Sequence, residues 1–198
     1  MTSIKQIFST FSIYQEESLY MNIFYLSNNP EKAAQMHCDK HVVKMIVEYC
    51  QLLSTSHRLL DGYPYRGLSD KSITTTHWQL NDEREDILYK ATHVAHPSSI
   101  WTRQNSEHYK WLYTLLCCLL EEYKWRYKKP QHACERLLPY LALLPHGMPE
   151  GCFTPPTPVM QPHYVIPGDS VTSYRKYYME VKSGFATWKR REKPFWWL

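Results

Sequence analysis

The chain has 198 residues, of which 43% are hydrophobic, so it is long enough to bury a full core and we expect one domain. Its formal net charge of +4 at pH 7 permits a polyanionic partner without demanding one. The six cysteines include no C-x-x-C pair, so we expect a reduced, cytoplasmic protein without a disulfide framework or zinc ribbon. No apolar run approaches the roughly 20 residues that span a bilayer, so we expect no membrane segment.

The N-terminal region divides at a second methionine. Residues 1–20 have weak periodicity, and we interpret them as an N-terminal extension to a domain that covers residues 21–198, with Met21 as a candidate alternative start. The next six residues, MNIFYL, are apolar and β-prone, which predicts a short N-terminal strand. Asn28 or Asn29 then caps a helix that has Pro30 in its first turn.

The stretch from Pro30 to Thr55 predicts the helix around which the rest of the chain is organised. A helical projection gives a polar stripe about 100° wide and an apolar arc about twice that width. The stripe comprises His37, Lys40, His41, Lys44, Glu48, Gln51 and Thr55. A surface helix also has a polar face, but this chemistry suits the floor of a cleft. Asp39 falls in the apolar arc, where we expect Arg103 or Arg175 to pair with it.

The remaining elements alternate between helices and loops. Helices are predicted over Asn81–Tyr89, just after Pro97, and over Ser106–Tyr127, Gln131–Leu144 and Ser170–Thr187, with loops over 61–76 and 145–167. The second loop holds most of the prolines, but its apolar residues favour packing onto the fold over disorder. The predicted fold class is therefore mainly α: a single-domain helical bundle with a short N-terminal strand and a long proline-rich loop.

Two residues of the polar stripe have the chemistry of a catalytic pair. Lys44 and Glu48 stand at i, i+4 spacing, where an amine nucleophile and a general acid/base could reach each other. His41 and His37 lie on the same predicted face, and we include both among the candidate catalytic residues. The commoner interpretation of Lys44 and Glu48 is an ordinary ion pair on a helix.

Cations and aromatic residues elsewhere provide a candidate lining for a nucleotide or nucleic acid. The helix N-termini near Ser98 and Ser106, with Arg103 beside them, predict a phosphate clamp, although these residues equally suit simple caps. Trp101, Tyr174 and Tyr178 are the candidate stacking surface. The full predicted binding set is Lys40, Ser98, Trp101, Arg103, Ser106, His163, Tyr174, Arg175, Tyr178 and Lys182.

A metal site is the third possibility in the sequence. His37 and His41 at i, i+4 could ligate zinc together with Asp39, His93 or His96. No H-E-x-x-H motif is present, and we expect neither a metal nor another cofactor.

Three segments resemble a family of proteins from tailed phages and other large DNA viruses. They are MNIFYLSNNPEKAAQMHCDKHVVKMIVEYCQLLSTSHR, THVAHPSSIWTRQNSEHYKWL and SYRKYYMEVKSGFATWKRREKPFWW, and the likeness covers most of residues 21–197. The architecture is also similar to the pyrimidine-dimer DNA glycosylases of the phage endonuclease V type. Those enzymes have a short N-terminal segment, a first helix with charged active-site residues, a long middle helix and an aromatic, basic C-terminal end.

The resemblance implies a viral DNA glycosylase-like protein in the host cytoplasm that acts on the N-glycosidic bond of a pyrimidine nucleotide. In that enzyme class the nucleophile is the mature N-terminal amine, supported by a glutamate on the first helix, which Glu48 matches here. Because 20 residues precede Met21, Lys44 becomes the substitute amine if the chain begins at Met1. The alternative is a non-catalytic viral binder that sequesters a nucleotide or blocks a host factor.

Overall fold

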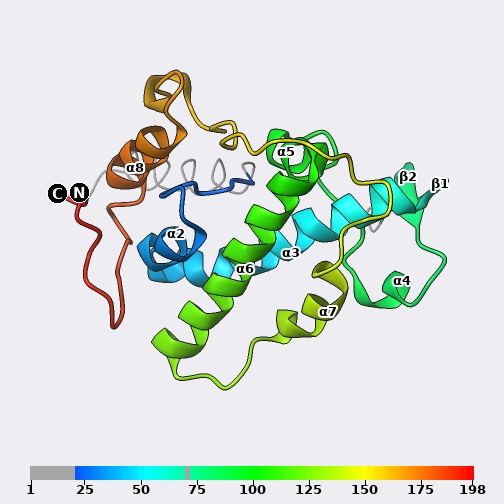
Figure 1. Cartoon of the computed structure of the whole chain (residues 1–198), viewed down its shortest axis with the longest axis horizontal. Helices are drawn as coiled ribbons and strands as arrows, with labels where there is room; N and C mark the ends of the chain where they lie inside the picture. The colour runs from blue at the N-terminus through cyan, green and yellow to red at the C-terminus, as the bar shows by residue number, and fades with distance from the viewer. Residues whose placement is uncertain (1–20, 70–71) are drawn as a thin grey trace, which may run out of the picture.

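The computed structural model describes residues 21–69 and 72–198 and is mainly helical, as the sequence predicts. The predicted extension over residues 1–20 lies outside the described residues. The described part contains seven α-helices and a two-stranded hairpin (Figure 1). The elements are α2 (Pro30–Met36), α3 (Asp39–Asp61), β1 (Tyr63–Leu68), β2 (Thr74–Gln79), α4 (Arg84–Ile87), α5 (Pro97–Gln104), α6 (Ser106–Tyr127), the 3-10 turn η1 (Ala133–Leu137), α7 (Leu138–Leu141), the 3-10 turn η2 (Pro162–Tyr164) and α8 (Ser170–Val181).

The two long helices, α3 and α6, form the centre of the fold and pack against each other, with α2 and α5 also against α6 (Figure 1). Their facing sides carry leucines and other apolar residues with almost no exposure, among them Met45, Ile46, Leu112, Leu116 and Leu119. Burying each such side chain stabilises the fold by about 1.5–3 kcal/mol. The α3 face opposite this core is therefore the one that can carry functional groups.

The predicted helix over Pro30–Thr55 begins at Pro30 with Asn29 as its cap, as expected, but it is interrupted within the stretch and ends later than predicted. The chain breaks at His37 and Cys38, whose ψ angles of 133° and 162° are extended, and α3 continues past Thr55 to Asp61. The break follows from Arg126 of α6, which donates hydrogen bonds of 2.8 Å to the carbonyl oxygens of Gln35 and His37. A straight helix would keep these oxygens for its own next turn. His37 consequently does not belong to the α3 stripe.

Asp39 has a different partner from the one expected. Its carboxylate lies 3.2 Å from Arg126 Nη1 and also accepts bonds from the Thr187 hydroxyl and the Lys189 backbone amide. Neither Arg103 nor Arg175 contributes to this set. Asp39 thus joins α3 to α6 and to the C-terminal tail, and its role is structural.

The predicted N-terminal strand is absent, because the strands of the described chain lie only in the β1–β2 hairpin. Residues Met21 to Leu26 are irregular and fully enclosed. Side chains satisfy part of their backbone: the Phe24 amide donates to the Tyr49 hydroxyl at 3.2 Å, and Ser98 Oγ donates to the Met21 carbonyl at 3.3 Å. The apolar run reflects burial among helices, which needs no neighbouring strand.

Later elements follow the prediction to different degrees. α6 has the predicted bounds, while β1 and the start of β2 lie in the predicted loop over 61–76 and β2 extends to Gln79. The helix predicted over Asn81–Tyr89 shortens to α4, and the one over Gln131–Leu144 becomes η1 and α7. The last helix, α8, ends at Val181 rather than Thr187. Within residues 21–69 and 72–198, no helix is both long and apolar enough to cross a membrane.

The proline-rich segment from Pro145 to Pro167 is irregular apart from η2, as predicted. It packs onto the helices through specific bonds: the Trp101 indole donates to the Thr154 carbonyl at 2.9 Å, and the Ser106 amide donates to the Pro149 carbonyl at 2.8 Å. This loop therefore covers the start of α5 and α6.

Candidate functional site

The candidate site begins with an ion pair on the polar face of α3. Lys44 Nζ lies 3.2 Å from Glu48 Oε1, with 49% of the lysine side chain exposed but only 16% of the glutamate. The second carboxylate oxygen, Oε2, is buried and has no hydrogen-bond partner in the described part of the chain. Buried oxygens without a partner are rare because each one costs free energy. Glu48 therefore has an acceptor that a proton can occupy.

Burial raises the pKa of Glu48, while the neighbouring Lys44 ammonium and His93 oppose that rise. A carboxyl group whose neutral form is favoured in this way can both accept and return a proton under mild conditions. The Lys44–Glu48 pair consequently unites an accessible amine with a proton carrier.

The loop before α5 brings two histidines to this face. Thr55 of α3 holds the loop, because its hydroxyl accepts from the Thr92 amide at 3.1 Å and donates to the Thr92 carbonyl at 3.3 Å. His93 follows with a φ of +49°, a left-handed conformation that few residues other than glycine adopt. Its ring centroid lies 6.3 Å from that of His96.

His96 carries a second buried group without a partner. Its Nδ1 accepts from the Ser98 amide at 3.2 Å, which leaves the proton of a neutral ring on Nε2. Burial lowers the pKa of His96, with a further contribution from His93, so the ring is neutral at pH 7. Nε2 is buried and has no partner among the described residues, and it therefore offers one hydrogen-bond donor.

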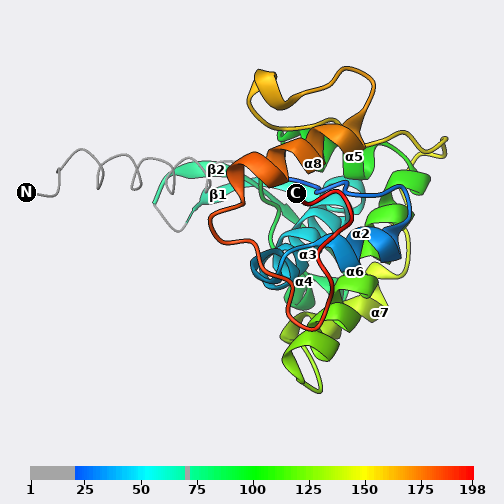
Figure 2. The same cartoon turned by 90° about the vertical axis from the view of Figure 1, so that its left-hand side faces the viewer.

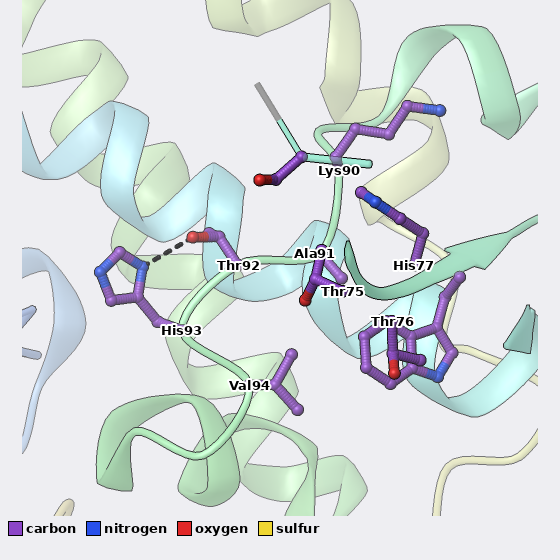
Figure 3. Close-up of a pocket in the computed structure, with 10 residues that line it drawn as sticks. Thr75, Thr76, His77, Lys90, Ala91, Thr92, His93 and Val94 are labelled. Atoms are coloured by element: carbon purple, nitrogen blue, oxygen red, sulfur yellow. Dashed lines mark hydrogen bonds between the residues drawn. The ribbon is translucent and has the colours of Figure 1, made fainter. Parts of the chain in front are cut away.

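A polar cavity of about 600 Å³ adjoins His93 (Figure 3). It lies between the hairpin and the loop before α5, with Thr92 and His93 at one end and His77 on β2 at the other (Figure 3). Its lining comprises Ser69, Thr75, Thr76, His77, Trp78, Lys90, Ala91, Thr92, His93 and Val94. Hydroxyls, an ammonium group, imidazoles and one indole suit a ligand with polar edges and a flat face. His93 links the cavity to Glu48, since it lines the cavity and its charge lowers the pKa of Glu48.

The structure assigns His37 and His41 to the core instead of the catalytic group. His37 is fully buried, its Nδ1 bonds to a carbonyl of α2, and burial lowers its pKa to about 4. His41 bonds through Nδ1 to the Tyr178 hydroxyl and stacks on Phe24 with 4.4 Å between ring centroids. Burial also lowers the pKa of His41 well below its ordinary value. Both rings are neutral packing groups that a substrate does not reach.

The predicted stacking surface is also part of the core. Trp101 is 4% exposed, and Tyr174 and Tyr178 have no exposure. Trp101 already stacks on His108 at 4.3 Å between ring centroids. A base cannot stack on a ring whose faces are covered, so these three residues are corrected from ligand contacts to structural aromatics.

The predicted phosphate clamp consists of caps and braces. The Ser98 hydroxyl and the Ser106 amide are bonded to backbone carbonyls, as described above, and both residues are buried. Arg103 donates to the Ser99 hydroxyl at 2.9 Å and to the Val94 carbonyl at 2.8 Å. Because Val94 follows His93, Arg103 supports the loop that carries the two histidines without itself lining the cavity.

The other predicted binding residues also lie outside the cavity lining. Lys40 is exposed on α3, and His163 is exposed on η2. Arg175 donates to the Leu26 carbonyl at 3.0 Å, while Lys182 is 4% exposed with its ammonium group over the Tyr177 ring. Lys40 stands one helical turn before Lys44, and the charges of Lys40, Lys44 and Lys182 all lower the pKa of His41, so these three cations lie near one another, whereas Arg175 is on α8 and His163 is on η2.

The sequence analysis missed the hairpin side of the cavity. Thr75, Thr76 and His77 line it, and the run TTTHW carried a usable signal, since β-branched and aromatic residues favour strands. His93 and His96 were considered only as metal ligands. No group of three or more histidine, cysteine or acidic residues within 21–69 and 72–198 could hold a metal ion.

Comparisons with protein-family models, with curated proteins and with solved structures found no match to this chain.

Proposed function

We propose that this protein is a DNA glycosylase-like enzyme that acts on the N-glycosidic bond of a pyrimidine nucleotide. One observation carries the proposal: a buried carboxyl group with a raised pKa and an unpartnered oxygen, Glu48, stands beside the amine of Lys44 and is affected by the charge of His93, which lines a polar cavity. Amines and carboxyl groups in this arrangement are the groups that nucleophilic displacement of a base requires.

In the proposed reaction, Glu48 Oε1 accepts a proton from the Lys44 ammonium across their 3.2 Å contact. The amine lone pair then forms a bond to C1′ of the deoxyribose while the C1′–N bond to the base breaks and its electrons pass to the base. Glu48 returns the proton to the departing base. The Lys44 nitrogen then passes one proton to O4′ as the C1′–O4′ bond breaks and a C=N bond forms, and water hydrolyses this iminium ion to give back the Lys44 amine and the sugar aldehyde.

His96 and the cavity have supporting roles in this proposal. Nε2–H of His96 donates to a carbonyl oxygen of the base, where negative charge develops as the bond breaks. An extruded nucleotide occupies the cavity, with its base against the Trp78 indole and its sugar and phosphate near the threonine hydroxyls and Lys90. Enzymes that act on a base in a duplex must extrude it in this way.

The test is release of base from duplexes that carry a damaged pyrimidine, measured beside DNA binding. Glu48→Gln should lower the release rate by about 10²–10⁴-fold with binding retained. Glu107→Gln is the matched control, because Glu107 forms an exposed helical pair with Lys110 at 2.8 Å. Unchanged release in Glu48→Gln would remove Glu48 from the reaction.

A second candidate is a non-catalytic protein that sequesters a nucleotide. The observation in its favour is that Lys44 is half exposed and paired at i, i+4, as in ordinary helical ion pairs. In that case Lys44→Ala weakens nucleotide binding, Glu48→Gln changes it little, and no base is released.

A further inference from the structure

A second groove, of about 670 Å³, lies between α2, the end of α6 and the C-terminal tail. Figure 2 shows the tail leaving α8 and running beside the helices on this side of the molecule. The lining comprises Lys32, Gln35, Met36, Trp125, Arg190, Arg191, Glu192, Pro194 and Phe195, and shares no residue with the cavity beside His93. The groove is therefore a separate candidate site.

The tail is fixed at several points, so the groove is preformed. The indoles of Trp188 and Trp196 donate to the carbonyl oxygen and the sulfur of Met36 at 3.0 and 3.4 Å. Arg191 forms an ion pair of 2.5 Å with Glu122, a buried residue of α6. A ligand does not have to order this wall before it binds.

Arg190 is held in an unfavourable backbone conformation that aims its side chain at the groove. Its φ is +61°, in the left-handed region that favours glycine. The guanidinium carbon lies 4.7 Å from the centroid of the Trp125 ring, and Nη1 donates to the Trp125 carbonyl at 2.5 Å. Strain that the surrounding structure maintains in this way is typical of functional positions.

The charges and rings of the groove match a nucleic acid strand. Lys32 and Arg190 are exposed cations without an acidic partner in the described structure, whereas Glu122 already neutralises Arg191. Phe195 is 80% exposed and Trp125 is 39% exposed, so flat apolar faces stand next to the cations. Proteins that bind single strands combine these two features: cations for phosphates and rings for bases.

We propose that this groove binds single-stranded nucleic acid, with Lys32 and Arg190 on phosphates and a base stacked on Phe195. The choice of ligand rests on the proposed function, but the binding needs none of the Lys44–Glu48 chemistry. The groove would hold a single strand independently of the cavity beside His93.

Fluorescence anisotropy of a labelled thymidine oligomer of about ten nucleotides, measured over a salt series, tests this proposal. Phe195→Ala should weaken binding at least about five-fold through lost stacking. Arg190→Gln should reduce the slope of log K against log salt by about 0.7, the value for one phosphate contact on a single strand. Lys110→Gln, a charge change on the exposed side of α6, is the control and should leave base stacking intact.

Arg190→Gly separates binding from folding. Glycine accepts the left-handed conformation, so its thermal unfolding should stay close to that of the parent protein while its salt slope falls as in Arg190→Gln. Glu48→Gln should keep full oligomer binding even though base release is lost. A variant that loses base release but keeps oligomer binding is therefore defective at the Lys44–Glu48 pair. A variant that loses oligomer binding but keeps base release is defective at the groove.

Three results would overturn the strand-binding proposal: no binding by the parent protein, unchanged binding by Phe195→Ala, or equal competition by polyglutamate. Equal competition by polyglutamate would show that the groove is a general site for polyanions or acidic peptides, to which the Phe195 ring does not contribute.

Discussion

Glu48→Gln should make the protein more stable at neutral pH, which is the reverse of what loss of an ordinary ion pair does. Glutamine keeps a polar atom at the position of the buried, unpartnered oxygen but carries no charge, and burying the charged carboxylate costs about 1–3 kcal/mol more than burying the neutral amide. Against this, the pair with the half-exposed Lys44 contributes less than about 1 kcal/mol. The net gain is about 1 kcal/mol, or roughly 2–4 °C in Tm for a chain of this size.

The gain should depend on pH with a defined sign. The pKa of Glu48 is raised in the folded state, so the folded protein holds this proton more tightly than the unfolded chain does. The parent protein consequently loses stability as pH rises from the unfolded pKa through the raised folded pKa, and glutamine does not titrate. The advantage of Glu48→Gln is full above the folded pKa and disappears below about pH 4, where both states are protonated.

Urea and thermal unfolding at about pH 4 and pH 7.5, followed by circular dichroism, measures this difference. Glu107→Gln should change stability by less than about 0.5 kcal/mol at both values, because its pair with Lys110 is exposed. A Glu48→Gln variant that is clearly less stable than the parent at pH 7.5 would instead make Glu48 a structural partner of Lys44.

Three other substitutions test the structural assignments. Arg126→Met should lower the free energy of unfolding by about 3–5 kcal/mol in urea titrations, since Arg126 is 1% exposed and its loss leaves buried acceptors unpaired. A loss below about 1 kcal/mol would contradict its role at the α2–α3 break. Trp101→Phe should lower the free energy of unfolding by about 1 kcal/mol, because the hydrogen bond to the proline-rich loop is lost. DNA binding measured by anisotropy should not change, and weaker binding would make Trp101 a DNA contact. Tyr178→Phe should cost about 1–3 kcal/mol because His41 Nδ1 loses its partner, and an unchanged Tm would refute that bond.

The sequence predicted best the features that local residues determine. The bounds of α6 follow from Asn105, whose side chain accepts from the Glu107 and His108 amides at 3.0 Å, and from the Lys128-Lys129-Pro130 stop. The break between α2 and α3 depends on Arg126, which is about 90 positions away and gives no local signal. An apolar run such as Met21–Leu26 likewise shows burial without revealing whether a strand lies beside it.

The candidate site divides in the same way. Lys44 and Glu48 are paired as the i, i+4 spacing predicts, because one helix fixes both positions. The burial of Glu48 Oε2 and the cavity between the hairpin and the loop before α5 arise from tertiary packing alone. The aromatic residues were ambiguous from composition, since Tyr and Trp serve cores and binding surfaces equally well. Here Trp101 and Tyr178 serve the core, whereas Phe195 is exposed.

In the proposed reaction an amine on this protein attacks the sugar of a pyrimidine nucleotide with Glu48 as proton carrier. Borohydride trapping with DNA that carries abasic or damaged pyrimidine sites, followed by mapping of the adduct, tests this reaction. We expect a covalent adduct on Lys44 that is strongly reduced in Glu48→Gln. Tight DNA binding without any adduct would contradict it.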